Sequence, residues 1–301
     1  MIAVVGSLNM DLVIHTEAIP RPGETVLGNS FHKIPGGKGG NQAAAAARLG
    51  SGVTMIGAVG EDELGEALIH SLKADGVKTD YIRKKKGIST GIAAIIVEKS
   101  GNNAIAVVSG ANYALSVEDV EKYHFIIDQA NVLLVQLETP LLTVKRALRL
   151  AKQTGCLTIL NPAPAVPLHH DILENIDILT PNEIELELLS GCPTGTMDEI
   201  HAAGRRLLDM GVRQLIVTIG DRGCVKIDKN GMVHYPAKKV TTVDTTAAGD
   251  CFNGALAVAL AEGKSVDDAI RFAVSASALS VTKFGAQTSL PTRKEVDNFN
   301  I

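Results

Sequence analysis

Residues 132–160, VLLVQLETPLLTVKRALRLAKQTGCLTIL, predict a strand, a helix and a second strand. Val132–Gln136 and Leu157–Leu160 are short apolar runs typical of buried strands, and Thr143–Gln153 repeats its apolar residues at helical spacing. Further strand-like and helical runs then alternate along the chain: Ile176–Leu179, Pro181–Ser190, Ile200–Met210 and Gln214–Ile219. The alternation predicts βαβ units around a mostly parallel sheet that helices cover on both faces.

The N-terminal and C-terminal parts of the chain are predicted to add a strand and helices to this sheet and its helical layers. Met1–Gly6 reads as a buried strand, and Gly39–Leu49 as an alanine-rich helix that ends at a glycine. Near the C-terminus, Gly249–Glu262 and Val266–Lys283 have the small-residue pattern of two long helices. No internal repeat or clear linker interrupts the chain, so one α/β body is expected.

A second, smaller sheet is predicted from two pairs of β-branched or apolar runs, each pair joined by a turn signal. These runs are Asp11–Ile19 with Thr25–Ile34, and Gly91–Glu98 with Ala104–Val108. We expect them to form a small antiparallel lid. The predicted lid comprises residues 11–35 and 89–111, and the predicted body comprises residues 1–10, 36–88 and 112–301.

Composition disfavours a nucleic-acid-binding protein. The 301 residues carry 29 Lys+Arg and 33 Asp+Glu, a net charge of −4, and they include no Trp, 4 Tyr and 6 Phe. Tracking phosphates needs a basic surface and stacking bases needs aromatic side chains, and both are scarce here. The one basic run, residues 83–86, is interpreted as a solvated turn before Gly87.

The chain has no feature that predicts secretion or a membrane span. Its N-terminus lacks a basic region, and no apolar stretch approaches the roughly 20 residues that cross a bilayer. The four cysteines are widely spaced without a C-x-x-C pair, which disfavours a zinc ribbon or a disulfide framework. Reduced cysteines and a cytoplasmic location are therefore expected.

The most informative segment for chemistry is Asp244–Gly254, DTTAAGDCFNG, which precedes an apolar helix. A turn of small residues entering a helix leaves backbone N–H groups unpaired, and these groups together with the helix dipole bind an anion such as phosphate. Asp250 lies in this positive field, where its carboxylate could accept a proton from an attacking hydroxyl. The alternative, a simple helix cap, does not explain the small residues before Asp250.

A second segment, Pro35–Ala43, contains four glycines in five positions, which allow a ligand to approach the backbone closely. It fits neither a Walker A loop nor a dinucleotide-binding fingerprint. Lys38 and Asn41 supply polar groups at the helix start. Asn9-Met10-Asp11, just after the first strand, adds others at the sheet edge where open α/β folds bind ligands. An ordinary glycine-rich turn remains the alternative.

These segments together resemble the phosphofructokinase-B type sugar kinases over essentially the whole chain. The resemblance is carried by five stretches: Asn9-x-Asp11, Gly36–Ala43, Gln136-Leu137-Glu138, Thr180–Glu185 and Asp244–Asp250. The first two are similar to the ribokinase branch of that family. Gly40, where alanine is usual, and Cys251, where a hydroxyl residue often follows the aspartate, are small departures. The resemblance implies a three-layer αβα fold with a β lid.

The resemblance also implies site residues. It assigns the sugar to Asn9, Met10, Asp11, Gly37, Lys38, Gly39, Gly40, Asn41, Glu138 and Asp250. It assigns the nucleotide to Asn182, Thr218, Ile219, Gly220, Asp221, Arg222, Gly223, Gly249 and Asp250, and an anion hole to Ala247, Ala248 and Gly249. It assigns potassium to Asp244, Thr246, Ser280, Lys283, Gly285 and Ser289, mostly through carbonyls, and indirect Mg²⁺ binding to Glu185.

Thr180–Glu185 matches the family motif and also has the residue preferences of a helix N-terminus. Thr180 is a good N-cap, Pro181 suits the first helical position and Glu183 stands in capping-box register. On that reading Asn182 and Glu185 are free for the Mg²⁺ shell near ATP. For residues 218–223 the residues alone favour an ordinary β-turn.

The implied activity is ATP-dependent phosphorylation of D-ribose at O5, with Asp250 as general base. A kinase of deoxyribose, fructose or a nucleoside stays open, as does a sugar-binding protein without catalysis. The scarcity of aromatic side chains disfavours a nucleoside, whose base needs a stacking surface. The lid is expected to close over the sugar and exclude water, and its open sheet predicts a homodimer.

Overall fold

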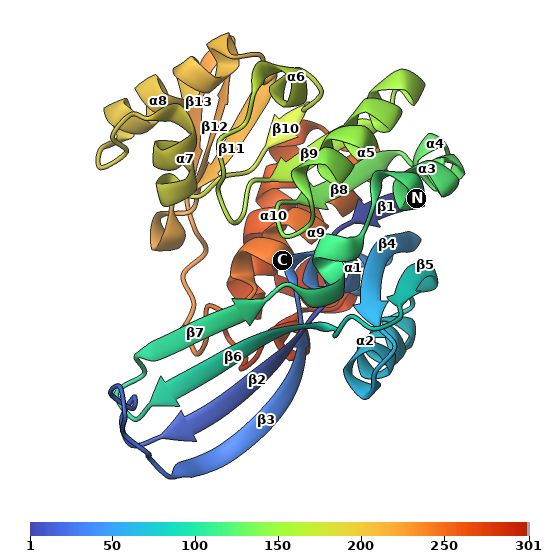
Figure 1. Cartoon of the computed structure of the whole chain (residues 1–301). Helices are drawn as coiled ribbons and strands as arrows, with labels where there is room; N and C mark the ends of the chain where they lie inside the picture. Colours follow the sequence, from blue (N-terminus) through green and yellow to red (C-terminus); the bar gives the residue numbers. More distant parts are fainter. Residues whose placement is uncertain (300–301) are drawn as a thin grey trace.

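A nine-stranded sheet runs through the centre of the computed structural model, which describes residues 1–299 (Figure 1). The strand order is β13-β12-β11-β10-β9-β8-β1-β4-β5, and the seven strands from β11 to β5 are parallel. β12 and β13 close the sheet as an antiparallel hairpin. The strands are β1 (Ile2–Val5), β4 (Val53–Gly60), β5 (Lys78–Lys85), β8 (Val132–Gln136), β9 (Leu157–Asn161), β10 (Ile178–Leu179), β11 (Gln214–Thr218), β12 (Cys224–Asp228) and β13 (Gly231–Tyr235).

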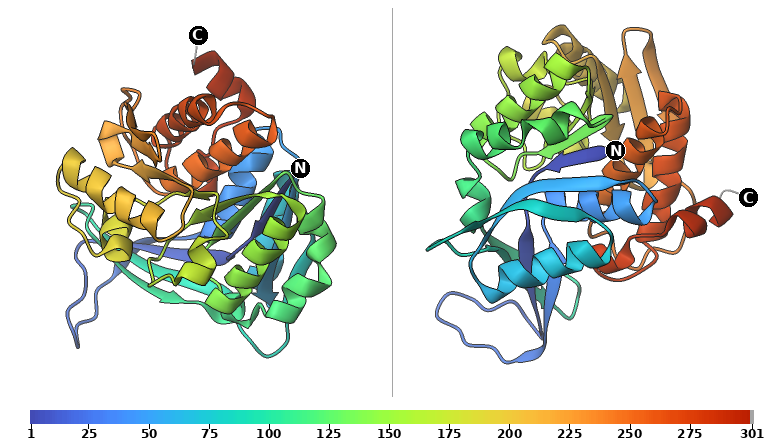
Figure 2. Two further views of the ribbon diagram at one scale, coloured as in Figure 1. Left: turned by 90° about the horizontal axis from the view of Figure 1, so that it is seen from above. Right: turned by 90° about the vertical axis from the view of Figure 1, so that its right-hand side faces the viewer.

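Helices cover both faces of this sheet, as the apolar runs predict (Figure 2). One core is formed with α1 (Lys38–Arg48), α2 (Glu63–Ala74), α9 (Ala248–Ala261), α10 (Val266–Ser280) and α11 (Arg293–Phe299). The other is formed with α3 (Val117–Lys122), α4 (His124–Asp128), α5 (Leu141–Thr154), α6 (His170–Leu173), α7 (Glu183–Ser190) and α8 (Met197–Asp209). Within β1, Ile2 and Val4 belong to the first core and Ala3 and Val5 to the second, so the strand is buried on both faces.

A separate four-stranded sheet projects from the body (Figure 1). Its order is β3 (Gly28–Gly36), β2 (Asn9–Thr16), β6 (Gly91–Glu98) and β7 (Asn103–Val108). The predicted small sheet is thus present, with antiparallel outer pairs and a parallel central pair, β2–β6. The central pair is parallel because β2 follows β1 and β6 follows β5, so both strands leave the same edge of the body sheet in one direction.

Arg83, Lys84 and Lys85 end strand β5, and only Lys86 lies in the turn before Gly87, which corrects the interpretation of the whole basic run as a turn. β5 is the edge strand of the large sheet, and its cations pair with neighbouring acids. Arg83 and Lys85 both contact Asp119, and Lys84 contacts Glu66. Charged side chains on an edge strand also oppose pairing with another sheet.

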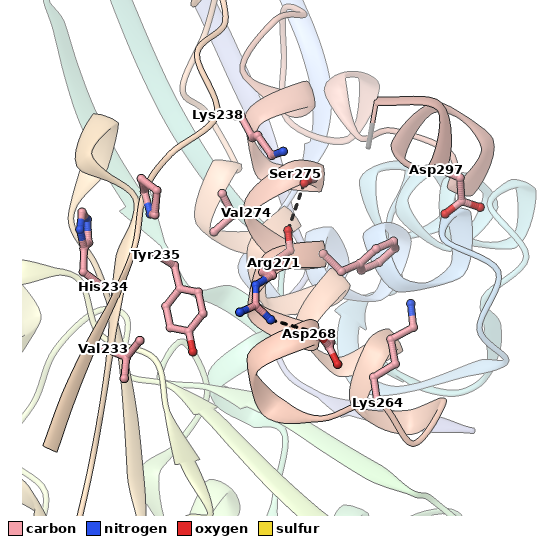
Figure 3. A pocket seen from close by; sticks show the side chains of 12 residues that line it. Val233, His234, Tyr235, Lys238, Lys264, Asp268, Arg271, Val274, Ser275 and Asp297 are labelled. Atoms are coloured by element: carbon pink, nitrogen blue, oxygen red, sulfur yellow. Dashed lines mark hydrogen bonds and ion pairs between the residues drawn. The ribbon is translucent and has the colours of Figure 1, made fainter. Parts of the chain in front are cut away.

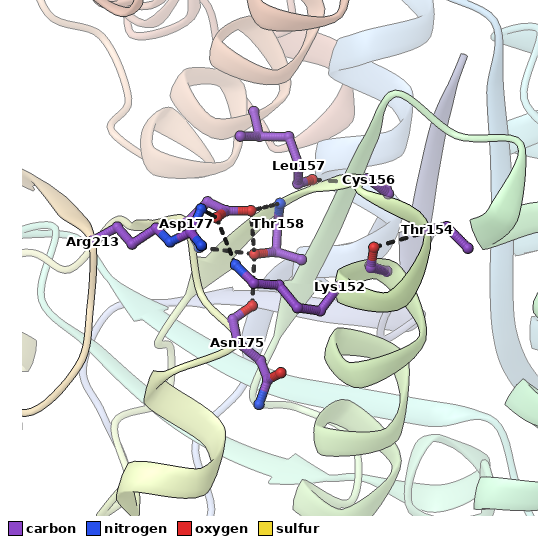
Figure 4. A network of polar contacts seen from close by, with 9 residues as sticks. Lys152, Thr154, Cys156, Leu157, Thr158, Asn175, Asp177 and Arg213 are labelled. Carbon is purple, nitrogen blue, oxygen red and sulfur yellow. Dashed lines mark hydrogen bonds and ion pairs between the residues drawn. The ribbon is translucent and has the colours of Figure 1, made fainter.

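A polar network fastens the end of the large sheet opposite the carboxyl ends of its parallel strands (Figure 4). Asp177, just before β10, accepts hydrogen bonds from Lys152 at 3.1 Å and Arg213 at 2.9 Å. It also accepts from the backbone N–H of Thr158 at 3.0 Å. The network ties α5, β9 and β10 together.

Among residues 1–299, no helix is long and apolar enough to cross a membrane.

Candidate active site

The start of α9 has the backbone geometry of an anion-binding turn. Ala247 adopts a left-handed conformation with φ 59°, the one positive φ outside glycine in the described chain. Its carbonyl accepts from the N–H of Cys251 at 2.8 Å, which closes the first helical turn. The N–H groups of Gly249 and Asp250 lie within that turn and precede the first helical hydrogen bond, so they can bind an anion.

Asp250 lies in the first turn of α9 with a side chain that is 7% exposed. Asn41 donates to its Oδ2 at 2.9 Å, and Gln42 donates to its Oδ1 at 3.0 Å. Burial raises the pKa of Asp250 above the ordinary value, while Lys38 and the two amides lower it, and the net shift is upward. A buried carboxylate with a raised pKa and a free lone pair on each oxygen is suited to accept a proton.

Gln42, one of the two residues that hold Asp250, belongs to a buried amide network that the sequence analysis did not single out. Gln42 Nε2 also donates to Asn161 Oδ1 at 3.1 Å, and Gln42 Oε1 accepts from Gln136 Nε2 at 2.6 Å. Asn161 Nδ2 in turn donates to the backbone carbonyl of Thr180 at 3.1 Å. Gln42 stands next to Asn41 in the glycine-rich segment, but nothing in its spacing identified its partners.

The glycine-rich loop is fixed to the carboxyl ends of β1 and β8. Glu138, just after β8, accepts from the backbone N–H of Lys38 at 3.0 Å and also from the Ser7 hydroxyl. Gly37 has φ 84°, and a Cβ there would lie 2.6 Å from the backbone nitrogen of Asn9. Gly39 packs as closely against Ser7. These two positions therefore require glycine.

The start of β2 presents Asn9 and Asp11 to the same region, and the Met10 side chain between them lies in the core. Asn9 Oδ1 accepts from Asn112 Nδ2 at 2.7 Å, and Asn112 also bonds the backbone of Leu8. The buried Asn112 therefore joins the segment that enters the small sheet at β2 to the segment that leaves it after β7. The sequence analysis did not single out Asn112.

The charges of the site influence one another. Burial, with added repulsion from Glu138 and Asp250, raises the pKa of Asp11 to about 7. Burial lowers the pKa of Lys38, but the carboxylates of Asp250, Glu138 and Glu185 outweigh it and raise the pKa overall. One lysine thus lies among four carboxyl groups, so a ligand must supply hydrogen-bond donors to some of them.

Two cavities meet at the start of α9. The smaller, about 250 Å³, is lined by Lys38, Asp250, Asn161, Asn253 and Glu185 among others. The larger, about 890 Å³, extends away from Asp250 between β11 and α10. Both are lined by five residues: Asn182, Thr218, Thr245, Ala248 and Gly249. A ligand could therefore lie in the larger cavity with one end reaching Asp250.

Only some of the residues predicted to bind the nucleotide line this larger cavity. Gly220, Asp221 and Gly223 line it with the shared residues. Ile219 lies in the core, and Arg222 does not line the cavity itself but pairs with Glu183, which does. Phe252 and Val274 provide an apolar wall, so a largely apolar ring system would fit there.

A further cavity of about 890 Å³ lies on the outer side of α10, between that helix and β13 (Figure 3). It shares Lys238 and Val274 with the larger cavity beside Asp250 but does not reach Asp250 itself. Its Arg271 is paired with Asp268 at 3.0 Å. This cavity has no direct part in the chemistry at Asp250.

The start of α7 differs from the local sequence interpretation. Asn182, not Thr180, is the N-cap, and it forms a capping box with Glu185 through bonds of 2.8 and 2.9 Å. The Thr180 hydroxyl instead donates to Asn253 on α9 at 2.6 Å. The cap therefore uses one oxygen of each of Asn182 and Glu185, which were expected to be free. Glu185 Oε1 remains for an indirect contact with a metal.

The segments predicted to hold a monovalent cation lie side by side. Asp244 Oδ1 accepts from the N–H of Thr246 at 2.9 Å, and Oδ2 accepts from the N–H of Gly285 at 2.9 Å. Burial raises the pKa of Asp244, but these bonds and that of the Thr246 hydroxyl lower it overall. The Lys283 side chain points to Glu295, which leaves its carbonyl as the possible ligand.

A buried carboxylate at a helix N-terminus, beside a polyol-sized polar site and a nucleotide-sized cavity, defines a phosphotransferase that acts on an alcohol. Residues 1–293 match the pfkB family of carbohydrate kinases, and the chain belongs to that family.

Characterised relatives support this assignment. The chain is 44% identical over 303 residues to a ribokinase of Bacillus subtilis, covering 98% of each chain. It is 39% identical over 300 residues to a deoxyribokinase of Salmonella typhi, covering 99% of this chain and 97% of the relative. Among solved structures, Arabidopsis thaliana ribokinase complexed with ribose and ATP superposes with a TM-score of 0.93 at 35% identity, covering 99% of this chain and 97% of that one.

Proposed function

We propose that this chain transfers the γ-phosphoryl group of ATP to O5 of D-ribose. One observation carries the proposal: the Asp250 carboxylate is buried where the nucleotide cavity meets the glycine-rich loop, and an amide fixes each of its oxygens. The ribokinase relatives and the structure with ribose and ATP support ribose as the acceptor.

The polar groups beside Asp250 suit a small polyol. Asn41 Oδ1 is buried and has no hydrogen-bond partner among the described residues, so a sugar hydroxyl would satisfy it. The carboxylate of Asp11 can accept hydrogen bonds from two further sugar hydroxyls, and the Lys38 ammonium group can donate one. We assign the sugar to the loop 37–41, Asn9, Asp11 and Glu138.

In the proposed step, Asp250 accepts the proton of the O5 hydroxyl as O5 attacks the γ-phosphorus. The bond from the γ-phosphorus to the bridging oxygen breaks, and its electron pair leaves with ADP. The N–H groups of Ala247, Gly249 and Asp250 would stabilise the negative charge on the transferring oxygens, whereas the N–H of Ala248, also predicted for the anion hole, is bonded to the Thr245 carbonyl at 3.2 Å. Mg²⁺, with Glu185 in its outer shell, would neutralise charge on the phosphates.

A monovalent cation, potassium by our assignment, would lie beside the anion hole. Asp244 and the carbonyls of 246, 280, 283, 285 and 289 would hold it. The hydrogen bond of Asp244 to Gly285 already joins the two segments. Positive charge there would offset the Asp244 carboxylate and order the turn that carries Ala247.

A coupled ADP-release assay over pentoses and hexoses, with K⁺ or Na⁺, tests the acceptor and the cation. We expect kcat/KM to be highest for ribose and the rate to increase severalfold in K⁺. Because deoxyribokinases are also relatives, 2-deoxyribose is the decisive competitor. A higher kcat/KM for 2-deoxyribose would make deoxyribokinase the function, and ATP turnover unaffected by every sugar would exclude both.

Asp250→Asn tests the base. It removes the proton acceptor but keeps the shape, so we expect kcat to fall about 10²–10⁴-fold. Calorimetric ATP affinity should change little, because Asp250 contributes to the nucleotide chiefly through its backbone. A near-normal rate would show that another group takes the proton.

We also propose a homodimer formed through the four-stranded sheet, and a cytoplasmic location. The sheet carries exposed apolar side chains, including Phe31, Ile105 and Val107, and its outer strands have free edges. All four cysteines are free thiols, which is consistent with a reducing compartment.

A further inference from the structure

Gln42 has an unusual set of contacts for a buried amide. Its side chain is fully buried on α1, and its three hydrogen-bonding contacts are all to side chains. Nε2 donates to Asp250 and to Asn161, and Oε1 accepts from Gln136. Both of its N–H groups and its carbonyl oxygen are therefore engaged.

The chemistry of the partners fixes the orientation of this amide. An ionised carboxylate only accepts hydrogen bonds, so the NH₂ group of Gln42 must face Asp250. With the amide reversed, Gln42 Oε1 would face the carboxylate oxygen and the NH₂ of Gln136 would face another NH₂. The donor from Gln136, on β8, therefore keeps the Gln42 donor directed at Asp250.

We propose that Gln42 is a positioning residue for phosphoryl transfer, whose amide holds the Asp250 carboxylate in its reactive orientation and in its charged form. The inference rests on the proposed role of Asp250 as the base. Asn41 also bonds Asp250, but it lies in the loop that receives the sugar, whereas Gln42 is anchored to the central sheet through Gln136.

Neutral amides suit this task better than a cation would. A lysine or arginine bonded to Asp250 would hold the carboxylate charged but make it a poor proton acceptor. The amide of Gln42 stabilises the charged carboxylate and offsets part of the cost of burial, while burial keeps the pKa of Asp250 above its ordinary value.

Gln42→Met tests this proposal, because methionine has a similar length and neither donates nor accepts strongly. We expect kcat at saturating ribose and ATP to fall about 10–100-fold near pH 7. We also expect the acid limb of the kcat–pH profile to move upward by about one pH unit, because the charged form has lost a donor. The KM for ATP should stay within about threefold.

Gln136→Met is the second variant, and it decides the matter if Gln42→Met does not fold. This variant keeps the donors from Asn41 and Gln42 to Asp250 but removes the group that orients Gln42. We therefore expect the acid limb of the kcat–pH profile to move upward, by less than in Gln42→Met.

Asn175→Leu is the matched control, because the Asn175 amide is buried at the opposite end of the sheet, where it donates to the Asp171 carbonyl at 3.0 Å. The backbone carbonyl of Asn175 accepts from Thr158 in the network of Figure 4. Asn175→Leu should lower the melting temperature without moving the limb.

An acid limb that does not move in either glutamine variant would overturn the inference. Asp250→Asn, measured in parallel, separates that result from a failure of the proposed function. If Asp250→Asn is inactive and the limb does not move, only the role of Gln42 is wrong. If Asp250→Asn retains a near-normal rate, the base has been assigned wrongly.

Discussion

The charge of Asp11 is sensitive to pH near neutrality. Its pKa of about 7 lies well above the ordinary value of 3.8 because the carboxyl group is largely buried beside Glu138 and Asp250. Only the ionised carboxylate of Asp11 can accept hydrogen bonds from sugar hydroxyls through both of its oxygens without carrying a proton of its own. We therefore expect the KM for ribose to rise as the pH falls below about 7.

Asp11→Asn should make the protein without sugar more stable at alkaline pH. The raised pKa means that Asp11 stabilises the fold fully below about pH 4, and that this contribution is lost as the pH rises through 7. The variant has no such loss. We expect it to exceed the wild type by roughly 1–2 kcal/mol at pH 8, allowing for solvent screening, and by much less at pH 5. Equal stability differences at both pH values would contradict the shifted pKa.

Gly40 is a second residue at which a simple substitution is informative. A Cβ there would lie no closer than 3.4 Å to Gln287 and Leu8, which is ordinary contact. Gly40→Ala should therefore stabilise α1 by about 0.5–1 kcal/mol and raise the melting temperature by about 2 °C.

The neighbouring Gly39→Ala is the matched control. Its Cβ would lie 2.5 Å from the backbone nitrogen of Ser7, which cannot move away easily. We expect this variant to lose roughly 1–3 kcal/mol of stability. If both variants melted like the wild type, the close packing of α1 against the first strand would be refuted.

Among the elements, the crossing of α1 and α9 brings the amides to the base. A Cβ at Gly254 would lie 2.7 Å from the Cβ of Ala45 and 2.9 Å from the backbone oxygen of Gln42. Gly254 is one helical turn after Asp250, so the glycine lets α1 approach within hydrogen-bonding distance of that carboxylate.

Gly254→Val should therefore impair both stability and catalysis. Separating the helices should cost roughly 1–3 kcal/mol and lengthen the bonds from Asn41 and Gln42 to Asp250. We expect a lower melting temperature and a kcat reduced about tenfold or more, measured under conditions where the variant is folded. A normal kcat in a destabilised variant would show that the spacing of the two helices does not position the base.

The start of α7 shows how a contact between elements overrides a local signal. Thr180-Pro181 has the residue preferences of a helix start, yet the helix begins at Glu183. Thr180 is buried, and its hydroxyl is bonded to Asn253 on α9, so it cannot cap α7. Asn182 takes its place as the N-cap.

For the whole molecule, the proposed dimer rests on the exposed small sheet. Ile105 is 56% exposed on β7. Ile105→Asp should put an uncompensated charge into the proposed interface and convert a dimer of about twice 31.6 kDa into a monomer, measured by light scattering. Leu142, 70% exposed on α5, is a matched position outside the sheet, and Leu142→Asp should leave the dimer intact. A wild-type chain that is monomeric at micromolar concentration would contradict the proposal.

Those parts of this protein whose signals lie within a short segment could be predicted from the amino-acid sequence. Apolar runs such as Val132–Gln136 and Gly91–Glu98 match their strands residue for residue, because burial and β-propensity act on the run itself. The segment around Asp250 likewise shows its anion-binding turn, because small residues before a helix leave N–H groups unpaired.

Contacts between side chains that are distant in the sequence could not be predicted in this way. Asp250 is more than 200 residues from Asn41 and Gln42, and Gln42 is 94 residues from Gln136. The parallel pairing of β2 with β6 was not predicted, and residues 83–85 were predicted to lie in a turn but form part of an edge strand. Such contacts depend on how the elements pack, and the properties of a short segment do not encode its distant partners.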